Sequence, residues 1–532
     1  MGTGRSFGRT ICALRCCTSR SVCSCSGASY RPSTENGLDT FYYSKCYFRG
    51  WIFHTRLVRY VPSESRFNIR IRFCTLHDFA YSFVLCDLAD PSTILYGQGS
   101  FFWCRRIGTL RKHLLLFTTN YPYGHYEPFI GLEMPFLSQG FERISIIPMS
   151  GSGPKREVPE NVTVEPPIWG SQWSRYKFYI LQLARFRTWS LFWPEVASLS
   201  WRKKRLHVGL IYRVILWSMY RAALERSPAV RKVLAAPSEA VAYSYWGHVP
   251  SLAIPLLAKA GVPCAVRYHR ADLYEHAAES APYLARNSQY FPWREEIASA
   301  AAMNLFISEH GLAYFQEKWP GGLASNFAVN RLGVPDRGET PPRLAADTSL
   351  VIVSCSNVFP VKRVHLIAAL VGSLAKHRKV SWHHFGGGDF TQVNSVLERA
   401  IPNLEVKLWG QTDNLHVMNF YRQNHIDIFV NLSLSEGVPV SIMEAISFGI
   451  PVIATAVDGT PEAVTDGETG SLVSPDEAQD SERLAERVLR ALSPGGELAR
   501  ASPRKTWQAR YRSSSNFGDL IDILHSMQAQ SC

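Results

Sequence analysis

Short apolar runs alternate with helical stretches along residues 350–473, and this alternation restricts the fold more than any other feature of the chain. Six runs have the length and side-chain content of buried strands: 350–355, 381–385, 404–409, 427–431, 451–455 and 470–473. Helical stretches fall between them, at 363–375, 391–400, 416–423 and 439–448. Strands that alternate with helices build βαβ units, so the sequence predicts a doubly wound α/β domain with a parallel sheet.

A second region of the same kind begins at residue 113. The run 113–119 (HLLLFTT) predicts a strand that ends in a turn at 120–124, and a helix over 127–139 leads to the next strand at 143–148. Further strands are expected at 240–244, 264–268 and 304–307, and the Pro-, Gly- and charge-rich segment 334–346 is expected to link the two halves. Open α/β domains bind ligands beyond the carboxyl ends of their strands, so we expect the ligand in a cleft between the halves.

Residues 1–112 differ from the rest of the chain in charge and in cysteine content. They hold 16 of the 57 Lys and Arg residues but only 6 of the 44 Asp and Glu residues, and nine of the 12 cysteines. The remainder is close to neutral, so the pI of 9.2 does not indicate nucleic acid binding. The cysteines form no C-x-x-C pair, and no helical or strand period is sustained. We expect a poorly ordered extension or an artefact of the assigned start.

One segment is a candidate for contact with a membrane. No run of 18 uncharged apolar residues occurs, and the first thirty residues lack the apolar core of a secretory signal. Trp201–Arg226, however, opens with four basic residues and continues apolar to Trp217. A basic, aromatic, amphipathic stretch can lie on an anionic membrane surface. It fits equally well a domain helix with a solvated basic start, and the sequence leaves both interpretations open.

The densest chemical signal is the segment 433–445 (SLSEGVPVSIMEA), which follows a buried strand and opens a helix. Pro439 suits the first helical turn. The N–H groups at a helix start can hold a diphosphate, and Gly437 lets a ligand approach the backbone closely. Glu436 lies just before the helix and Glu444 about one and a half turns inside it, so the two carboxylates can address separate parts of one elongated ligand.

These residues resemble a known family. EGVPVSIME at 436–444 is similar to the E-x7-E motif of the retaining family 4 (group 1) glycosyltransferases, which have the GT-B fold. The similarity continues through 449–470, and 353–364 and 385–390 (FGGGDF) resemble the family's first C-terminal strand with its loop and the family's glycine turn. In the N-terminal half, the segments closest to polysaccharide-assembly members of the colanic-acid type are 119–124, 267–275, 307–311 and 331–334.

The resemblance implies a role for each charged residue of these motifs. Glu436 is expected to contact the donor sugar, and Lys362 the donor diphosphate, where an ammonium offsets the charge of the leaving group. Glu444 is expected to bind the nucleotide ribose. His269 matches a family histidine at the cleft edge and is expected to contact the donor sugar or to stabilise the reacting region.

The backbone of Gly437, Val438 and Pro439 is expected, again by resemblance, to hold the donor sugar and phosphate. Gly124 is expected to let the first N-terminal loop approach the donor or acceptor, and Gly387 to do the same from the other half. One position departs from the pattern: the family commonly has an arginine five residues before the lysine, and this chain has Asn357. The missing charge puts phosphate stabilisation in doubt, and the neighbouring Arg363 is a candidate replacement.

The predicted reaction is the transfer of a hexose from a UDP or GDP sugar to a lipid-linked or oligosaccharide acceptor in polysaccharide biosynthesis, with retention of anomeric configuration. No cofactor is expected. The body lacks the D-x-D motif that would hold a divalent ion, so we expect no metal, and it lacks the phosphate-binding loops of kinases and NAD enzymes. No nucleic acid partner is expected, and the predicted location is the cytoplasm, with peripheral attachment to the inner face of the membrane through 201–226 as an option.

The expected organisation is an atypical extension at 1–112, an acceptor-side domain at 113–340, a nucleotide-sugar domain at 345–505 and a C-terminal helix at 506–532 that packs back on the N-terminal domain. Other functions remain open on the same scaffold. One is a sugar-nucleotide epimerase or a phosphorylase. Another is a catalytically silent sugar-nucleotide-binding subunit, which Asn357 leaves open. The third is a basic membrane-surface or nucleic-acid adaptor.

Overall fold

The computed structural model describes residues 34–35, 38–48, 51–60, 69–74, 113–124, 127–170, 172–201, 208–274, 290–319, 326–344, 348–398, 401–498 and 501–527. The chain forms two compact units, 1–105 and 106–532.

The first unit contains an antiparallel sheet in the order β1-β2-β3-β4. Its strands are β1 (Thr34–Glu35), β2 (Leu38–Phe48), β3 (Trp51–Tyr60) and β4 (Ile69–Cys74). The sequence shows no sustained strand period here, but the strands are rich in aromatic and β-branched residues, which favour extended backbone. Most of 1–112 lies outside the described residues. This includes the segments on which the expectation of disorder or of an artefactual start depends.

The second unit begins with a seven-stranded parallel sheet in the order β11-β10-β9-β8-β5-β6-β7. Leu114 and Leu116 face one core cluster, and Leu115 and Phe117 face the other. Both faces of the sheet are therefore covered, which explains why its first strand is continuously apolar rather than alternating. The strands are β5 (His113–Thr118), β6 (Arg143–Pro148), β7 (Val162–Val164), β8 (Ala240–Ser244), β9 (Cys264–Tyr268), β10 (Met303–Phe306) and β11 (Phe327–Val329).

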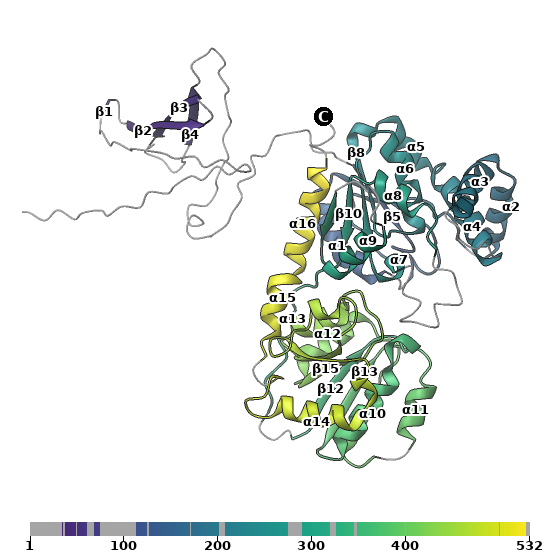
Figure 1. Ribbon diagram of the computed structural model, residues 1–532, viewed down its shortest axis with the longest axis vertical. Coiled ribbons are helices and arrows are strands. Elements are labelled where there is room, and N and C mark those ends of the chain that lie inside the picture. Colours follow the sequence, from purple (N-terminus) through teal and green to yellow (C-terminus); the bar gives the residue numbers. More distant parts are fainter. Residues whose placement is uncertain are drawn as a thin grey trace, which may run out of the picture. The chain divides into compact units, whose positions relative to one another are not determined.

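Helices cover both faces of this sheet (Figure 1). Helix α1 packs on one face, and most of the others contribute to the core on the opposite face. Their bounds are α1 (Pro128–Gly140), α2 (Gln172–Leu183), α3 (Phe186–Trp201), α4 (Val208–Leu224), α5 (Pro228–Ala235), α6 (Ile254–Lys259), α7 (Arg270–Leu273), α8 (Arg294–Ala300) and α9 (Glu309–Lys318), with 3-10 turns η2 (Pro237–Glu239) and η3 (Val249–Ala253).

A second parallel sheet follows, with six strands in the order β14-β13-β12-β15-β16-β17. Here too neighbouring residues face opposite cores: Ile352 and Val430 face one cluster, Val353 and Phe429 the other. The strands are β12 (Leu350–Cys355), β13 (Val380–Phe385), β14 (Leu404–Leu408), β15 (Ile428–Asn431), β16 (Val452–Thr455) and β17 (Gly470–Val473). The prediction of an α/β chain with two parallel, Rossmann-like sheets is confirmed, with strand ends that differ by a residue or two.

The helices of this second domain are α10 (Val364–Ala375), α11 (Thr391–Leu397), α12 (Asn414–Gln423), α13 (Val440–Ser447) and α14 (Ser481–Leu492). Three 3-10 turns lie between its elements: η5 (Pro360–Lys362), η6 (Thr460–Glu462) and η7 (Glu477–Gln479). Pro439 is the N-cap of α13, so this helix begins one residue later than the sequence predicts. The loops after β12 and β15 supply most of the site described below.

Two helices close the chain, where the sequence suggested one. Helix α15 (Pro503–Arg510) packs Trp507 into the core of the second domain, and α16 (Ser513–Ser526) packs Phe517 against Phe136 of α1, with ring centroids 5.3 Å apart. The break lies at residues 511 and 512, where Asn516 donates a hydrogen bond to the carbonyl of Arg510 (2.8 Å). The last helix thus lies on the first domain of the unit (Figure 1).

Helices α2, α3 and α4 form a group of their own beside the first sheet (Figure 1). Within Trp201–Arg226, the apolar residues Leu210, Val214 and Trp217 are buried. The buried side of α4 therefore serves the core, whereas Val208, Ile211 and Tyr212 at its start are exposed. The basic run 202–205 lies outside the described residues. Among the helices of the described ranges, none is both long and apolar enough to span a bilayer.

Candidate active site

The site forms around the loop between β15 and α13. The four residues of β15 are buried, and two backbone N–H groups fix the loop that follows. Ser433 N–H donates to Asn431 Oδ1 (3.0 Å), and Leu434 N–H donates to the carbonyl of Val361 (2.8 Å). The second bond ties this loop to the loop after β12. Because β12 and β15 are parallel neighbours, their carboxyl ends bring the two loops together.

Lys362 and Glu436 meet at this junction. Lys362 ends the turn η5 after β12, and its Nζ lies 2.6 Å from Glu436 Oε1. Asn431 donates a second, longer hydrogen bond to the same oxygen (3.3 Å). The Glu436 side chain is almost fully buried, whereas that of Lys362 is one-quarter exposed. The structure therefore places a carboxylate and an ammonium, 74 residues apart in the sequence, side by side at one sheet edge.

A third loop, after β16, fixes the backbone at Glu436. Asp458 Oδ2 accepts the Glu436 N–H (3.0 Å) and also the hydroxyl proton of Ser435. A Cβ at Gly459 would lie 1.8 Å from the carbonyl oxygen of Gly437, so only glycine allows the two loops to approach this closely. Sequence reasoning missed Asp458, because its distance of 22 residues from Glu436 gives no local pattern; its position after a predicted strand was the available signal.

The second carboxylate, Glu444, lies within α13 and is buried. Its Oε1 accepts a hydrogen bond from Asn414 Nδ2 (2.7 Å) at the start of α12. Burial raises the pKa of Glu444 to about 7, against the lowering effects of Asn414 and of the charge on Arg337. A carboxyl with this pKa exchanges between a hydrogen-bond donor and an acceptor near neutral pH, and either form can bind a hydroxyl group.

The residues Gly437, Val438 and Pro439 connect the two glutamates. Val438 is buried in the core, and Pro439 caps α13, with its carbonyl accepting the N–H groups of Ile442 (3.0 Å) and Met443 (3.2 Å). Both residues are therefore buried, and the Pro439 carbonyl is already bonded within α13.

Asn357 and Gly387 lie at neighbouring loops of the same domain. Asn357 is exposed in the loop after β12, and Gly387 accepts the N–H of Val358 (2.8 Å) from the loop after β13. The adjacent Gly386 has a φ of +133°, and a Cβ there would lie 2.0 Å from the carbonyl oxygen of Ser356. The glycine turn thus lets the β13 loop pack on the β12 loop that carries Asn357 and Lys362.

Arg363 does not replace the missing arginine. Its φ is +48°, and its side chain is buried. Nε donates to the carbonyl of Leu432 (2.6 Å), and the terminal nitrogens to those of Pro475 (3.3 Å) and Ser433 (3.4 Å). Burial lowers its pKa. The guanidinium therefore holds the β15 loop from inside, and the expectation that it faces the phosphate is wrong.

On the first domain, His269 caps the short helix α7. Its backbone N–H donates to Asp272 Oδ1 (2.6 Å), and its ring stacks on Tyr245, with centroids 4.9 Å apart. Both ring nitrogens are buried and have no hydrogen-bond partner among the described residues. Burial, with the nearby charges of Arg267 and His248, holds its pKa well below the usual value, so the imidazole is neutral at physiological pH. Two unsatisfied nitrogens leave His269 able to bond a ligand.

Gly124 lies in the loop after β5, with a φ of +64°, and its N–H donates to the carbonyl of Pro154 (2.9 Å). This loop is organised by Glu127, which sequence reasoning missed. The Glu127 carboxylate accepts the N–H groups of Thr119 (3.0 Å), Asn120 (2.5 Å) and Tyr121 (2.5 Å). A buried carboxylate that binds successive N–H groups fixes a loop that has no regular structure of its own.

The two domains contact each other beside the Lys362–Glu436 pair. Arg270, directly after His269, donates from Nε to the hydroxyl of Ser435 (2.8 Å). A Cβ at Gly437 would lie 3.1 Å from Ile307 and 3.4 Å from Arg270, so this glycine also allows close approach of the first domain. Residues of the N-terminal motif 267–275 and of the C-terminal motif 433–445 are therefore direct neighbours.

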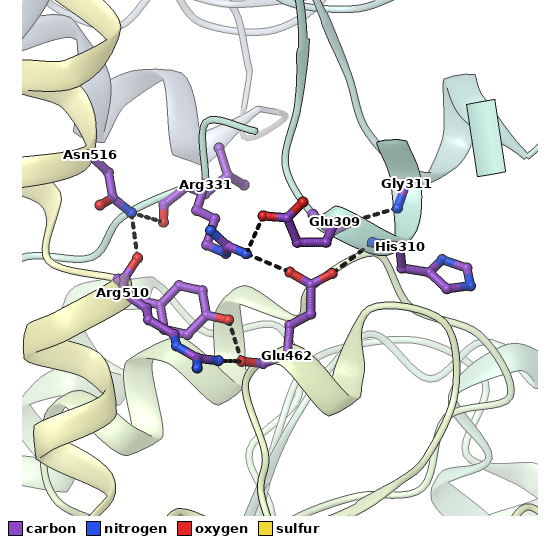
Figure 2. Close-up of polar contacts among 10 residues, drawn as sticks. Glu309, His310, Gly311, Arg331, Glu462, Arg510 and Asn516 are labelled. Atoms are coloured by element: carbon purple, nitrogen blue, oxygen red, sulfur yellow. Dashed lines mark hydrogen bonds and ion pairs between the residues drawn. The ribbon is translucent and has the colours of Figure 1, made fainter. Parts of the chain in front are cut away.

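A second group of contacts joins the domains at Glu462, on η6 (Figure 2). Its Oε1 accepts the N–H of His310 at the start of α9 (2.9 Å), and its Oε2 accepts Arg331 (3.0 Å), which also contacts Glu309 (3.2 Å). Its backbone carbonyl accepts Arg510 (3.1 Å) and the hydroxyl of Tyr511. Sequence reasoning singled out 307–311, 331–334 and 449–470 as separate motifs, but it missed the contact between them, since the members lie in four separate segments.

Comparison with known proteins agrees with this architecture. The family described as glycosyl transferases group 1 matches residues 336–505. A putative colanic acid biosynthesis glycosyltransferase of Escherichia coli K12 is 26% identical over 217 residues, which cover 36% of this chain and 52% of the relative. The chain thus spans about half the length of that relative.

Solved structures share the fold. The sucrose-phosphate synthase of Thermosynechococcus elongatus has a TM-score of 0.55 at 16% identity, covering 79% of this chain and all of the other. Anabaena HepE in complex with UDP has a TM-score of 0.50 at 17% identity, covering 78% of this chain and all of the other. Residues 336–505 thus match the group 1 glycosyltransferase family, and both domains share the GT-B fold with these solved structures.

Proposed function

We propose that the chain is a retaining glycosyltransferase that moves a hexose from a UDP or GDP sugar to a lipid-linked or oligosaccharide acceptor in polysaccharide biosynthesis. The observation that carries the proposal is the Lys362–Glu436 pair, 2.6 Å apart at the junction of the β12 and β15 loops. A nucleotide sugar needs a cation at its diphosphate and a hydrogen-bond acceptor at its sugar hydroxyls, and this pair offers both. The likeness to a putative colanic acid biosynthesis glycosyltransferase supports a role in polysaccharide biosynthesis, and the UDP complex of HepE supports a nucleotide sugar as donor.

The proposed roles follow from the chemistry of each group. Glu436 accepts hydroxyls of the donor sugar, and Lys362 stabilises the charge that develops on the departing diphosphate. Glu444 binds the ribose from its buried position, while the neutral His269 bonds the sugar from the first domain. In a retaining reaction the departing phosphate takes the acceptor proton on the face where the new bond forms. Only contacts that strengthen in the transition state accelerate this step, which gives Lys362 the largest effect.

Arg270 is the proposed substitute for the charge that Asn357 lacks. Its guanidinium bonds Ser435, next to Glu436, although it comes from the other domain. Contact between Arg270 and the diphosphate would therefore couple donor binding to the distance between the two domains. The side-chain cations Lys362 and Arg270 supply the positive charge in this proposal, which assigns no role to a metal ion.

The test supplies the full chain with a panel of UDP and GDP hexoses and an oligosaccharide acceptor, and measures donor consumption by the release of nucleoside diphosphate. Wild-type protein should consume one donor, and Glu436→Gln should lower the rate by about a hundred-fold or more, since a neutral amide cannot replace the carboxylate. The exposed Glu486→Gln is the matched control and should retain the wild-type rate.

The remaining outcomes distinguish the alternatives. Nucleotide binding without consumption of any donor would contradict the proposal in favour of a silent sugar-nucleotide-binding subunit. Conversion of one nucleotide sugar into an epimer, with no nucleoside diphosphate released, would identify an epimerase. If transfer is observed, the anomeric configuration of the product, read by nuclear magnetic resonance, tests retention directly.

A further inference from the structure

Exposed large apolar side chains are concentrated on one helical group of the molecule. Thirteen such side chains are exposed among the described residues, and nine of them lie between residues 176 and 212, on α2, α3 and the first turn of α4. Single exposed apolar residues are common on protein surfaces, but a cluster of this kind marks an interaction site.

The exposed residues follow the helical period. On α2, Tyr176, Ile180 and Leu183 recur at intervals of four and three residues and so share one face. On α3, Phe186 and Trp193 are seven residues apart, again on one face, and are 85% and 62% exposed. We call these five residues the α2–α3 face.

The inner sides of the same helices pack in apolar cores. Phe178 of α2 and Leu191 of α3 belong to the core of the first domain, and Phe192 and Leu199 pack in a smaller cluster with Leu210 of α4. The α2–α3 face is therefore a second apolar side of helices that are already anchored. Within the described part of the chain, Ile180, Phe186 and Trp193 of this face are largely exposed.

Cationic side chains flank this face. Arg175, Lys177 and Arg185 lie on α2 or directly after it. The described residues of α2, α3 and α4 include one carboxylate, Glu195, which is buried and accepts the N–H of Trp293 (3.1 Å). An aromatic and aliphatic surface flanked by cations, with no exposed anion on its helices, is complementary to a surface with an apolar interior and anionic head groups.

We propose that the α2–α3 face binds the surface of an anionic lipid bilayer. Phe186, Trp193 and Ile180 enter the boundary between head groups and acyl chains, and Arg175 and Lys177 contact the phosphates. The proposal places the membrane-binding residues on α2 and α3, beside Val208, Ile211 and Tyr212, the exposed apolar residues within 201–226. It does not depend on the proposed transfer activity, because it involves no residue of the Lys362–Glu436 site.

The experiment is flotation of the full chain with vesicles of phosphatidylcholine, alone or mixed with phosphatidylserine. Wild-type protein should bind the mixed vesicles and lose binding at high salt, since the electrostatic part is screened. Phe186→Ser should weaken binding by about ten-fold, the effect of removing one large apolar side chain from the bilayer boundary. Leu344→Ser is the matched control, because Leu344 is 75% exposed outside this face, and should bind as wild type does.

Two charge-reversal variants separate the electrostatic contribution to binding from the apolar one. Lys177→Glu should weaken binding to mixed vesicles, whereas Lys379→Glu, an exposed lysine of the second domain, should not. Equal binding of wild type, Phe186→Ser and Ile180→Ser/Trp193→Ser would overturn the proposal. Concentration-dependent self-association that Phe186→Ser abolishes, without vesicle binding by the wild type, would also overturn it and identify the face as a contact between two copies. Titration with UDP and GDP on the same samples reports on the donor site separately.

Discussion

Charged side chains at the site differ in how well neighbouring groups compensate their charge. Lys362 and Glu436 neutralise each other, and a donor that inserts its sugar and diphosphate between them would exchange one set of charge-assisted bonds for another. Glu444 is more isolated, with Asn414 as its hydrogen-bond donor, and its raised pKa is the cost of burying a carboxylate with little compensation. Burial of the Glu444 carboxylate therefore costs stability, and the proposed contact with the donor ribose is a reason for keeping it there.

The raised pKa of Glu444 predicts a pH dependence of stability. Between its ordinary value of 4.5 and about 7, the folded protein keeps a proton that the unfolded chain releases. The contribution of this group to the free energy of unfolding therefore falls as the pH rises through that window. Glu444→Gln cannot ionise, so it should stabilise the protein at pH 8 by about 1–3 kcal/mol relative to its effect at pH 5.

Thermal unfolding of wild type and Glu444→Gln at both pH values measures this difference. Glu486→Gln, at an exposed position of α14, is the control and should show the wild-type pH dependence. Parallel pH profiles for wild type and Glu444→Gln would show that the carboxyl ionises as freely in the folded protein as in the unfolded chain.

Arg270 makes a prediction of rescue. If it supplies the cation that Asn357 lacks, Arg270→Gln should lower donor turnover by about ten- to a hundred-fold, and Asn357→Arg should restore part of the loss in the same protein. Steady-state rates for the two single variants and the double variant give the coupling between the positions. Full activity of Arg270→Gln would exclude a role at the diphosphate.

The elements that were predicted from the sequence share one property: a short stretch of sequence is enough to show which of their residues are buried. Strands such as β5 and β12 are covered on both faces and are therefore continuous apolar runs bounded by turns. Helices α2 and α3 were missed, because exposed apolar residues such as Ile180 and Trp193 on their outer sides obscure the helical period. The motif around α13 was recognisable as a whole, although its partners Asp458 and Asn414 come from distant loops.

Arg363 illustrates the same limit at the level of a turn. A charged residue beside a predicted phosphate site appears free to reach the ligand, but its φ of +48° sends the side chain toward the carbonyls of the β15 loop. The sequence carries no signal for that conformation. The orientation is set by packing between β12 and β15 and is visible only in three dimensions.

The glycine turn after β13 gives a prediction at the scale of an element. Gly386→Ala would place a Cβ 2.0 Å from the Ser356 carbonyl oxygen at a φ of +133°, so it should destabilise the second domain by about 2 kcal/mol or more. Gly467→Ala is the control: its φ is +74° with open space around it, so it should cost about 1 kcal/mol from the backbone alone. Chemical unfolding measures both. Equal losses would mean that the β12 and β13 loops do not pack closely.

At the scale of the whole second unit, Glu462 links the domains through one carboxylate (Figure 2). It accepts the His310 N–H and Arg331, both from the first domain, while its own backbone lies on the second. We expect Glu462→Ala to loosen the contact and to raise amide hydrogen exchange at residues 308–312 by about ten-fold, since charge-assisted hydrogen bonds are lost.

Glu309→Ala is the matched control for that variant. Glu309 contacts the same Arg331 (3.2 Å) but belongs to the first domain, so its loss should leave the contact between the domains intact. Mass-spectrometric hydrogen exchange of the three proteins distinguishes the effects. Unchanged exchange in Glu462→Ala would mean that the remaining contacts, including Arg270 on Ser435, hold the domains without it.

The central claim is that the loops after β12 and β15, with α13, form the site of a nucleotide sugar donor. Its most direct test is thermal unfolding of the full chain titrated with UDP, GDP and ADP, for wild type, Glu444→Ala and Lys362→Ala, with the exposed Glu486→Ala and Lys376→Ala as controls. A nucleotide at 100 times its Kd stabilises the folded protein by about 2.7 kcal/mol. UDP or GDP should raise the midpoint in wild type and both controls but not in the two site variants. A nucleotide that raises the midpoint equally in all five proteins, or none that raises it in folded wild type, would contradict the assignment.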